Sequence, residues 1–434
     1  MSFWRKRLST LLILSLASTS ILLAGCGGNA DSNASNTEEK TAEATAQAGE
    51  SAEKNETEDT STTEKEEATA SSAPAETEQE VTAEAGEPFM EIDGLTFTGK
   101  TELEYAECFS VDNYEGGYSL INIPDSGTFL VVPEDGSVPE DLSDEVVVLQ
   151  QPLDRIYLAA TSAMALFAAT DSVDHIRMSG TTAENWYVDE AVKAMKAGDI
   201  LYAGKYSEPD YETLIAEDCD LAIESTMIYH TPKVKEMLED MDIPVLVDRS
   251  SYEEHPLGRT EWIKMYAVLT GKQAEAESFF KEQSKVIEDL QGFGATDKTV
   301  AFFFINSDGS IVVRGSSDYI PKMIKLAGAN YIFDQIEGDG TSVGITMEEF
   351  YASAVDADYL IYNGSIDGNI KTIADLVKQN ELFKDFKAVK DGNVWNTGKS
   401  FYQATDIVGQ MIRDIHVMIT DGSADDMTFL QQLK

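Results

Sequence analysis

The chain has 434 residues, with 78 acidic side chains against 32 basic ones and a formal net charge of −46. This length accommodates two or three domains. The charge excludes a nucleic-acid-binding protein, because no basic face is available to neutralise phosphates. The four histidines are scattered and show no paired metal-ligand spacing, so we expect no bound metal ion and no resident cofactor. They are His175, His230, His255 and His416.

The first 25 residues have the pattern of an export signal. Basic residues at positions 5–7 precede an apolar run from Leu8 to Leu23. The following Leu23-Ala24-Gly25-Cys26 resembles the cleavage site of a lipoprotein signal, which implies that Cys26 becomes a lipid-modified N-terminus. An ordinary secretory signal with an incidental cysteine is the alternative. We therefore expect an extracytoplasmic protein that is lipid-anchored to the cell membrane.

Residues 26–86 have the composition of a disordered tether. From Gly27 to Gly86 there are sixteen acidic residues and three lysines, and Val81 is the single large aliphatic residue. Such a segment cannot bury enough apolar surface to offset the entropy lost on ordering. We expect it to hold a folded part away from the membrane surface.

Residues 87–151 predict a small sheet that extends the first of two lobes, residues 87–257. Apolar residues alternate or cluster there between glycine-containing turns. Residues 94–101 also match the phosphate-loop pattern GxxxxGK[ST]. That mechanism needs a loop that leads into a helix, whereas Leu95 and Phe97 alternate with threonines as in a strand, so nucleotide binding is not predicted.

Strand and helix patterns alternate from Asp154 to Asp248 and again from Thr299 onward. This alternation predicts an α/β protein of two lobes, 87–257 and 292–434, with mainly parallel sheets flanked by helices. The pattern of residues 258–291, between the two lobes, predicts a long linking helix. The break at Thr270-Gly271-Lys272 leaves a second interpretation open, in which two helices follow each other and the one from Gln273 joins the lobes.

Three segments resemble the substrate-binding proteins of ABC importers that capture iron-siderophores, haem or cobalamin. They are RIYLAATSAMALFAA (155–169), DILYAGKYSEPDYETLIAEDCDLAIES (199–225) and VVRGSSDYIPKMIKLAGANYIF (312–333). Cys219 departs from the family's usual proline before the strand, and Ala329 replaces a glycine. The resemblance implies two lobes joined by a helix, a ligand cleft between them, a permease dimer as partner and a monomeric protein.

Loops at the strand ends are expected to supply the ligand contacts. The candidates are Thr161, Ser162, Tyr206, Tyr229, His230, Tyr252, His255, Arg259, Arg314, Tyr362, Asn363, Tyr402 and Gln403. Tyrosines offer flat contact area, and arginines offer a planar fork for a carboxylate or an anionic chelate. For each tyrosine, packing within a lobe is the competing interpretation. For His255 and Arg259 the alternative is a structural role at the start of the linking helix.

Two glutamates have a different predicted role. Glu212 and Glu348 occupy the first turns of predicted helices, one in each lobe. The resemblance implies that such a pair contacts arginines of the two permease subunits. Glu349 competes with Glu348, and a simple favourable interaction with the helix dipole is the alternative for both positions.

Two other protein classes compete with a binding protein. A surface-anchored hydrolase needs a nucleophile with a base, and the chain contains no GxSxG motif, so we do not expect an enzyme. A lipid-anchored scaffold without a ligand is the third class. Cys108 and Cys219 are compatible either with a disulfide or with two separate thiols.

Overall fold

The structure is a computed structural model that describes residues 86–291, 294–316, 318–336, 342–366, 368–420 and 427–434. The predicted signal peptide (1–25), the predicted lipidation site Cys26 and the predicted tether up to residue 85 lie outside the described residues. In the described parts of the chain, no helix has both the length and the apolar character needed to cross a bilayer.

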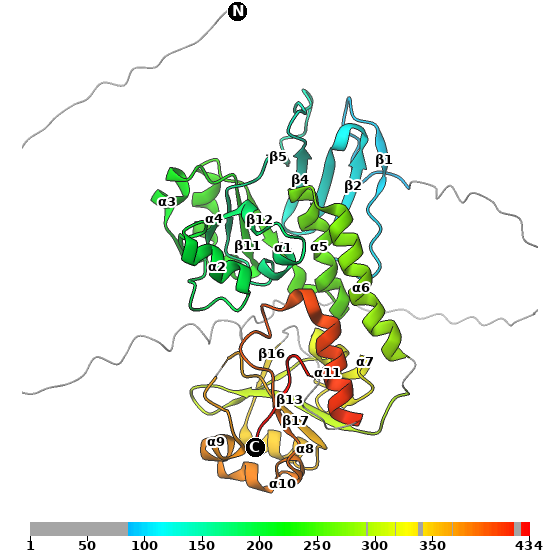
Figure 1. The fold of residues 1–434 in the computed structure, drawn as a ribbon, viewed down its shortest axis with the longest axis vertical. Helices are drawn as coiled ribbons and strands as arrows, with labels where there is room; N and C mark the ends of the chain where they lie inside the picture. Colours follow the sequence, from blue (N-terminus) through cyan, green and yellow to red (C-terminus); the bar gives the residue numbers. More distant parts are fainter. Residues whose placement is uncertain (1–85, 292–293, 317, 337–341, 367, 421–426) are drawn as a thin grey trace, which may run out of the picture. The chain divides into compact units, whose positions relative to one another are not determined.

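The appended sheet formed by residues 97–150 has five strands in the order β1-β2-β3-β4-β5 (Figure 1). Neighbours are antiparallel except β4 and β5, which run parallel. The strands are β1 (Phe97–Lys100), β2 (Ser110–Tyr114), β3 (Ser119–Ile123), β4 (Gly127–Val132) and β5 (Val146–Gln150). The residues that match a phosphate loop form a turn and strand β1, and no helix follows them. The sequence-based rejection of nucleotide binding therefore agrees with the local structure.

The first lobe has a five-stranded parallel sheet in the order β12-β11-β6-β7-β8. Its strands are β6 (Ile156–Leu158), β7 (Ile176–Ser179), β8 (Leu201–Tyr202), β11 (Leu221–Ser225) and β12 (Val245–Asp248). Its helices are α1 (Met164–Ala169), α2 (Asp189–Ala197), α3 (Tyr211–Ala216) and α4 (Pro232–Glu239), and β9 (Gly204–Lys205) with β10 (Glu208–Pro209) makes a small hairpin.

Successive side chains of these strands are buried on opposite faces of the sheet. Tyr157, Ala222 and Val247 pack with residues of α3 and α4 in one apolar cluster. Ile156 and Leu158 of β6 and Leu221 and Ile223 of β11 pack with α1 and α5 (Pro256–Thr270) in a larger cluster. Strands that are buried on both faces explain the continuous apolar runs in the sequence, and they place every connecting loop at a strand end.

A buried acid interrupts the face toward α3 and α4. Glu224 on β11 has no exposed surface, and neither of its carboxyl oxygens has a hydrogen-bond partner among the described residues. Burial raises the pKa of Glu224 well above its ordinary value, because the charged form loses its hydration. The folded protein therefore favours the protonated carboxyl.

Replacing Glu224 with Met is expected to raise the free energy of unfolding at pH 8 by about 1 kcal/mol or more. The pKa of Glu224 is higher in the folded protein than in the unfolded chain. The native protein therefore keeps its full free energy of unfolding below about pH 4 and loses part of it as the pH rises toward the folded-state pKa. Urea unfolding between pH 5 and 8 measures the difference, with Glu236→Gln on the exposed side of α4 as the control. A variant less stable than the native protein at pH 8 would show that the carboxylate has a partner in solution.

Two helices, not one, follow the first lobe. Helix α5 (Pro256–Thr270) ends where Gly271 adopts a left-handed conformation with φ of 73°, and α6 (Gln273–Gln291) begins two residues later. The interpretation with two helices is therefore the correct one. All but the last residue of α5 are buried, whereas α6 buries a stripe that includes Ala276, Phe280 and Ile287.

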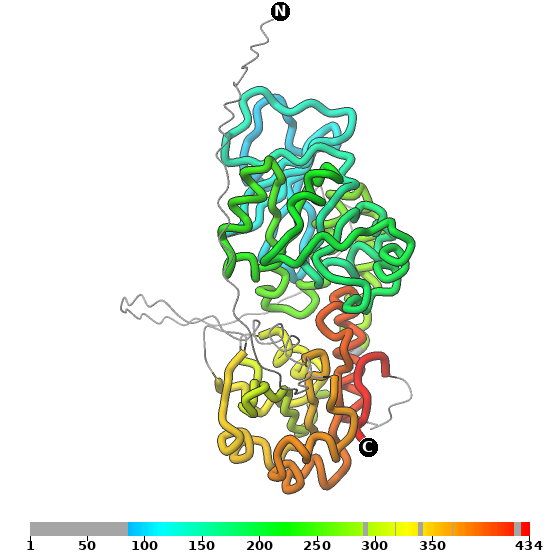
Figure 2. The backbone as a smooth tube through the Cα atoms, turned by 90° about the vertical axis from the view of Figure 1, so that its left-hand side faces the viewer, coloured from blue at the N-terminus to red at the C-terminus, as the bar shows by residue number. Residues whose placement is uncertain are grey.

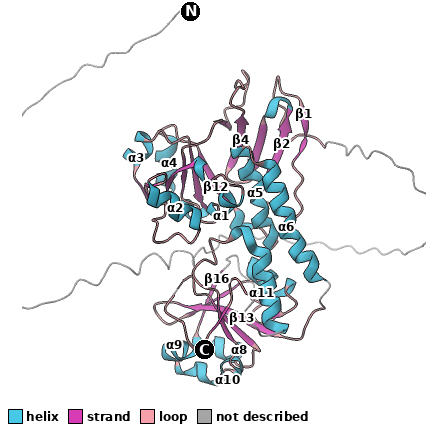
Figure 3. Ribbon diagram, in the orientation of Figure 1, coloured by secondary structure: helices cyan, strands magenta, loops and turns pink. Residues whose placement is uncertain are grey.

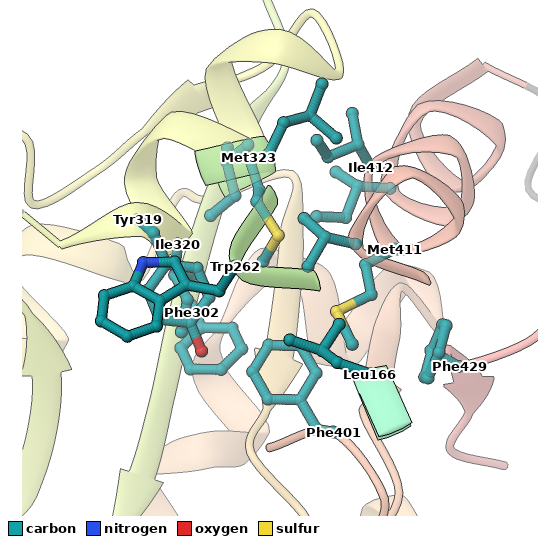
Figure 4. Close-up of a cluster of buried hydrophobic side chains, with 14 of the residues drawn as sticks. Leu166, Trp262, Phe302, Tyr319, Ile320, Met323, Phe401, Met411, Ile412 and Phe429 are labelled. Carbon is teal, nitrogen blue, oxygen red and sulfur yellow. The ribbon is translucent and has the colours of Figure 1, made fainter. Parts of the chain in front are cut away.

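The C-terminal helix α11 (Val408–Thr420; Figure 1, red) packs against α5, α6 and α7 (Tyr319–Leu326). Leu166 of α1 and Trp262 of α5 belong to the same apolar cluster as side chains of the second lobe (Figure 4). The labelled second-lobe members are Phe302, Tyr319, Ile320, Met323, Phe401, Met411, Ile412 and Phe429. The lobes therefore share a continuous hydrophobic core around the helices that link them.

The second lobe has a mixed sheet in the order β16-β14-β13-β17-β18-β19, with β15 also paired to β13. Strands β13, β15, β17 and β18 run parallel, while β14, β16 and β19 are antiparallel to their neighbours. The strands are β13 (Thr299–Ile305), β14 (Ile311–Arg314), β15 (Asn330–Tyr331), β16 (Ser342–Ile345), β17 (Tyr359–Tyr362), β18 (Val394–Asn396) and β19 (Gln431–Gln432). Figure 2 follows the chain through this lobe to the C-terminal strand.

Besides α11, the second lobe contains the helices α7, α8 (Met347–Ala354), α9 (Ile373–Gln379) and α10 (Lys387–Asp391), shown in cyan in Figure 3. Contacts between aromatic rings fix α8 and the neighbouring segment 381–386 to the sheet. Phe303 of β13 lies 4.6 Å from Phe350 and 5.6 Å from Phe383, measured between ring centroids. Asp414 of α11 accepts hydrogen bonds from the backbone N–H groups of 428–430, which holds the chain end in place.

Two buried carboxylates attach the appended sheet to α5. Glu261 accepts hydrogen bonds from the backbone N–H groups of residues 104–106 at 2.8–3.1 Å. Glu253 accepts from the N–H groups of 107 and 108 and from the indole of Trp262. The chains approach so closely that a Cβ at Gly258 would lie 3.0 Å from the Tyr105 carbonyl oxygen. The appended sheet is therefore a firmly held part of the first lobe.

Candidate ligand-binding site

The first-lobe candidates lie after the carboxyl ends of parallel strands, as the sequence predicted. Thr161 and Ser162 follow β6, Tyr229 and His230 follow β11, and Tyr252 follows β12, whereas Tyr206 lies in the turn of the β9–β10 hairpin after β8. The Ser162 hydroxyl donates to Asp248 Oδ2 at 3.0 Å, and the Tyr266 hydroxyl donates to the same oxygen at 2.9 Å. Asp248 thus fixes the turn after β6 to the end of β12.

Two of these tyrosines are exposed and held by contacts with their neighbours. The hydroxyl of Tyr229 donates to the backbone carbonyl of Asp125 at 3.2 Å. The guanidinium of Arg249 lies 4.9 Å from the centre of the Tyr252 ring. His230 is also exposed, and Tyr206 is half-buried. The aromatic surface at this edge is therefore available to a ligand.

In the second lobe, Arg314 is the centre of a buried polar group. Its Nη1 donates to Ser342 Oγ at 2.7 Å and lies 3.5 Å from Asp318 Oδ2, and its Nη2 donates to the Tyr402 hydroxyl. Asn363 Nδ2 donates to the same hydroxyl at 2.7 Å. Three predicted residues from segments far apart in sequence therefore meet at one point.

Arg259 reaches this region from the linking helix α5. Its guanidinium carbon lies 4.1 Å from the centre of the Tyr319 ring, and the side chain is almost fully buried. Its Nε has no hydrogen-bond partner among the described residues. Asp318 feels the charges of both Arg314 and Arg259, while burial raises the pKa of Asp318. Two arginines and one carboxylate interact in this group, which leaves an excess of positive charge.

Direct contacts connect the lobes beside this group. The Gln403 side chain donates to the Asn185 carbonyl at 2.8 Å and accepts from the Tyr187 N–H at 2.7 Å. The Thr260 hydroxyl donates to the Thr405 carbonyl at 2.8 Å. Gln403 thus joins the loops that follow β7 and β18.

Residues 160–400 match the model of the periplasmic binding protein family. The chain belongs to this family. Members are the extracytoplasmic solute-binding proteins that work with the permease of an ABC transporter, so the chain is extracytoplasmic and is not an enzyme. The hydrolase alternative is accordingly set aside. The appended sheet, residues 97–150, lies outside the matched range.

The chain is also similar to individual proteins. The chain is 27% identical over 293 residues to an uncharacterized lipoprotein of Methanocaldococcus jannaschii, covering 63% of this chain and 68% of that protein. It is 25% identical over 214 residues to the Fe(3+)-citrate-binding protein YfmC of Bacillus subtilis, covering 48% and 64%. Among solved structures, the periplasmic haem-binding protein HutB of Vibrio cholerae shares the fold with a TM-score of 0.51, at 15% identity and 61% and 98% coverage.

Three predicted contact residues of this periplasmic binding protein have structural roles instead. Tyr362 has no exposed surface and packs edge-on against Phe303 in the second-lobe core, so the prediction of a ligand contact is wrong. Asn363 is fully buried and orients Tyr402. His255 Nδ1 accepts from the Leu257 N–H, and the ring stacks on Tyr105 at 4.4 Å. Burial lowers the pKa of His255 and so favours the neutral ring. A neutral ring can accept this hydrogen bond and cap the start of α5.

Sequence reasoning missed other members of the site. Asp318 and Tyr319 follow Arg314 by only a few residues, but the sequence predicted Arg314 alone as a ligand contact. Asp318 carries a recognisable signal, because its carboxylate accepts from the Ile320 N–H and caps α7. Ser342, Arg249 and Asp125 gave no signal in the sequence, since their positions depend on contacts between distant segments.

Within the described ranges, no group of three or more His, Cys, Asp or Glu side chains is arranged to hold a metal ion. Cys108 and Cys219 are both free thiols, so the alternative of a disulfide between them is wrong. Burial raises the pKa of each thiol to about 12. Neither thiol is therefore set up to act as a thiolate ligand or nucleophile.

The two predicted docking glutamates occupy equivalent helix positions. Glu212 is the second residue of α3 after the capping Asp210, and Glu348 is the second residue of α8 after the capping Thr346. Both side chains are exposed. The Glu349 carboxylate instead accepts from the Thr346 N–H and hydroxyl in a capping box. This local role distinguishes Glu349 from Glu348.

Proposed function

We propose that this protein captures a metal chelate or tetrapyrrole, such as an iron-siderophore, haem or cobalamin, and delivers it to an ABC permease dimer. It acts as a monomer that is held at the membrane through a lipid on Cys26. It needs no cofactor of its own, because any iron or cobalt arrives with the ligand.

The observation that carries this proposal is the positive group formed by Arg259 and Arg314, which interact with the single carboxylate of Asp318. Arg259 brings a buried donor without a partner among the described residues, and Tyr319 and Tyr402 border the two guanidinium groups. A guanidinium fork with adjacent rings suits an anionic ligand that also has a flat or apolar part. The relative named for binding Fe(3+)-citrate supports an iron chelate in particular.

Titration of the purified full-length protein with haemin, ferric citrate, ferrichrome and cyanocobalamin tests the proposal, with tryptophan fluorescence and visible absorbance as readouts. Replacing Arg314 with Gln is expected to weaken binding of the recognised probe about 10- to 100-fold, because a charge-assisted hydrogen bond is worth about 1.5–3 kcal/mol. Arg413→Gln on an exposed position of α11 is the matched control. Binding of none of the four probes, or equal binding by Arg314→Gln, would contradict the proposal.

A further inference from the structure

The turn between β3 and β4 of the appended sheet is docked on the strand-end edge of the first lobe. The Ser126 hydroxyl accepts from the Val247 N–H at 3.1 Å and donates to the Val247 carbonyl at 3.4 Å. Asp125 next to it has a positive φ of 61°, which turns the chain sharply. Because Glu253 and Glu261 also anchor residues 104–108, the appended sheet is held to the first lobe at two separate points, one of which is this turn.

Asp125 meets a charged and aromatic group at this edge. Its carboxylate lies 3.4 Å from Arg249 Nη1, and its carbonyl accepts from the Tyr229 hydroxyl. The Asp125 side chain is 80% exposed, whereas that of Arg249 is only 17% exposed. Arg249 is therefore held in place beneath an exposed and readily replaced carboxylate, with the Tyr252 ring on its other side.

The segment that carries Tyr252 also contacts the second lobe. Glu254, two residues after Tyr252, pairs with Lys322 of α7 at 3.3 Å. Tyr229 and Arg249 follow β11 and β12, so they lie on the same edge as Ser162, whose hydroxyl bonds to Asp248 at the end of β12. A ligand bound at this edge of the first lobe would thus lie within reach of Arg249.

We propose that Asp125, Arg249, Tyr229 and Tyr252 form an outer ligand-binding rim, in which Arg249 takes an anionic group of the chelate in place of Asp125. The two tyrosine rings contact the flat or aromatic part of the same ligand. The appended sheet therefore takes part in recognition by contributing a carboxylate that competes for Arg249. This proposal deepens the proposed function and rests on it.

The exchange of partners on Arg249 predicts opposite effects for two substitutions. Asp125→Asn removes the competing charge and is expected to tighten binding about two- to fivefold, the range of an exposed ion pair. Arg249→Gln removes the cation and is expected to weaken binding about tenfold or more. A purely structural ion pair would make both substitutions act in the same direction or leave binding unchanged.

The test is titration of the full-length protein with haemin and with ferric citrate, two anionic probes, at low ionic strength. Asp93→Asn, in an exposed turn before the same sheet, is the control and is expected to bind like the native protein. Urea unfolding establishes that each variant is folded. Opposite shifts for Asp125→Asn and Arg249→Gln support the rim, and any other pattern overturns it.

The two proposals fail in distinguishable ways. If Arg314→Gln weakens binding but the Asp125 and Arg249 variants do not show opposite shifts, the rim is overturned and the proposed function stands. If the native protein binds neither haemin nor ferric citrate, the rim is overturned too. If such a protein still binds ferrichrome or cyanocobalamin, the proposed capture of a metal chelate or tetrapyrrole stands without the rim.

Discussion

Charge reversal at Glu212 and Glu348 together is expected to abolish ligand uptake by cells while the affinity of the purified protein for its ligand stays unchanged. Each carboxylate is exposed at the second position of a helix, one in each lobe, so a permease dimer can contact one with each subunit. Opposite charges at a protein interface steer association, and like charges placed together cost several kcal/mol. Lysine at both positions converts attraction to arginines into repulsion.

Uptake of ⁵⁵Fe supplied as ferric citrate or haemin, in source cells that carry only the variant protein, provides the measurement. The loss of favourable interaction with each helix dipole is only about 0.3–1 kcal/mol, so both variants are expected to fold. Glu236→Lys on α4 serves as an exposed charge reversal away from these helix starts. If affinity fell together with uptake, these glutamates would belong to the ligand site and not to the docking surface.

Replacing Glu261 with Ala is expected to lower the free energy of unfolding by about 3–5 kcal/mol, the cost of breaking a buried ion pair. Glu261 is fully buried, accepts from three backbone N–H groups of the appended sheet and lies 3.1 Å from Lys264 Nζ. Its removal leaves buried donors without acceptors and weakens the attachment of residues 104–106 to α5. Urea unfolding measures the total loss, and limited proteolysis reports release of the 102–108 segment.

The same lysine supplies a matched control. Glu277 also pairs with Lys264 at 3.1 Å, but its side chain is 63% exposed. Glu277→Ala is therefore expected to cost no more than about 1 kcal/mol, as exposed ion pairs do. Equal losses for the two variants would show that the hydrogen bonds from residues 104–106 contribute little to stability.

The order of strands and helices along the chain could be predicted from the sequence, because secondary structure follows the local periodicity of apolar residues. The apolar runs of β11 and β13 and the helical patterns of α6 and α11 each depend on neighbouring residues only. The break at Gly271 is also local, because glycine is the residue that most readily adopts the left-handed backbone conformation found there. Tyr362 shows where this fails, because a tyrosine at a strand end has the same sequence pattern whether its ring faces a ligand or Phe303.

By itself, the sequence determined the class of protein and the general location of the site, because strand ends and helix starts are defined by short segments. It thereby selected Arg314, Tyr402 and Asn363 as separate candidates. Only the tertiary structure brought them together with Arg259 and Tyr319, and only it placed the turn at Asp125 on Arg249. These contacts join residues up to 124 positions apart, and no local pattern encodes them. They depend on how the faces of the sheets and helices bury one another.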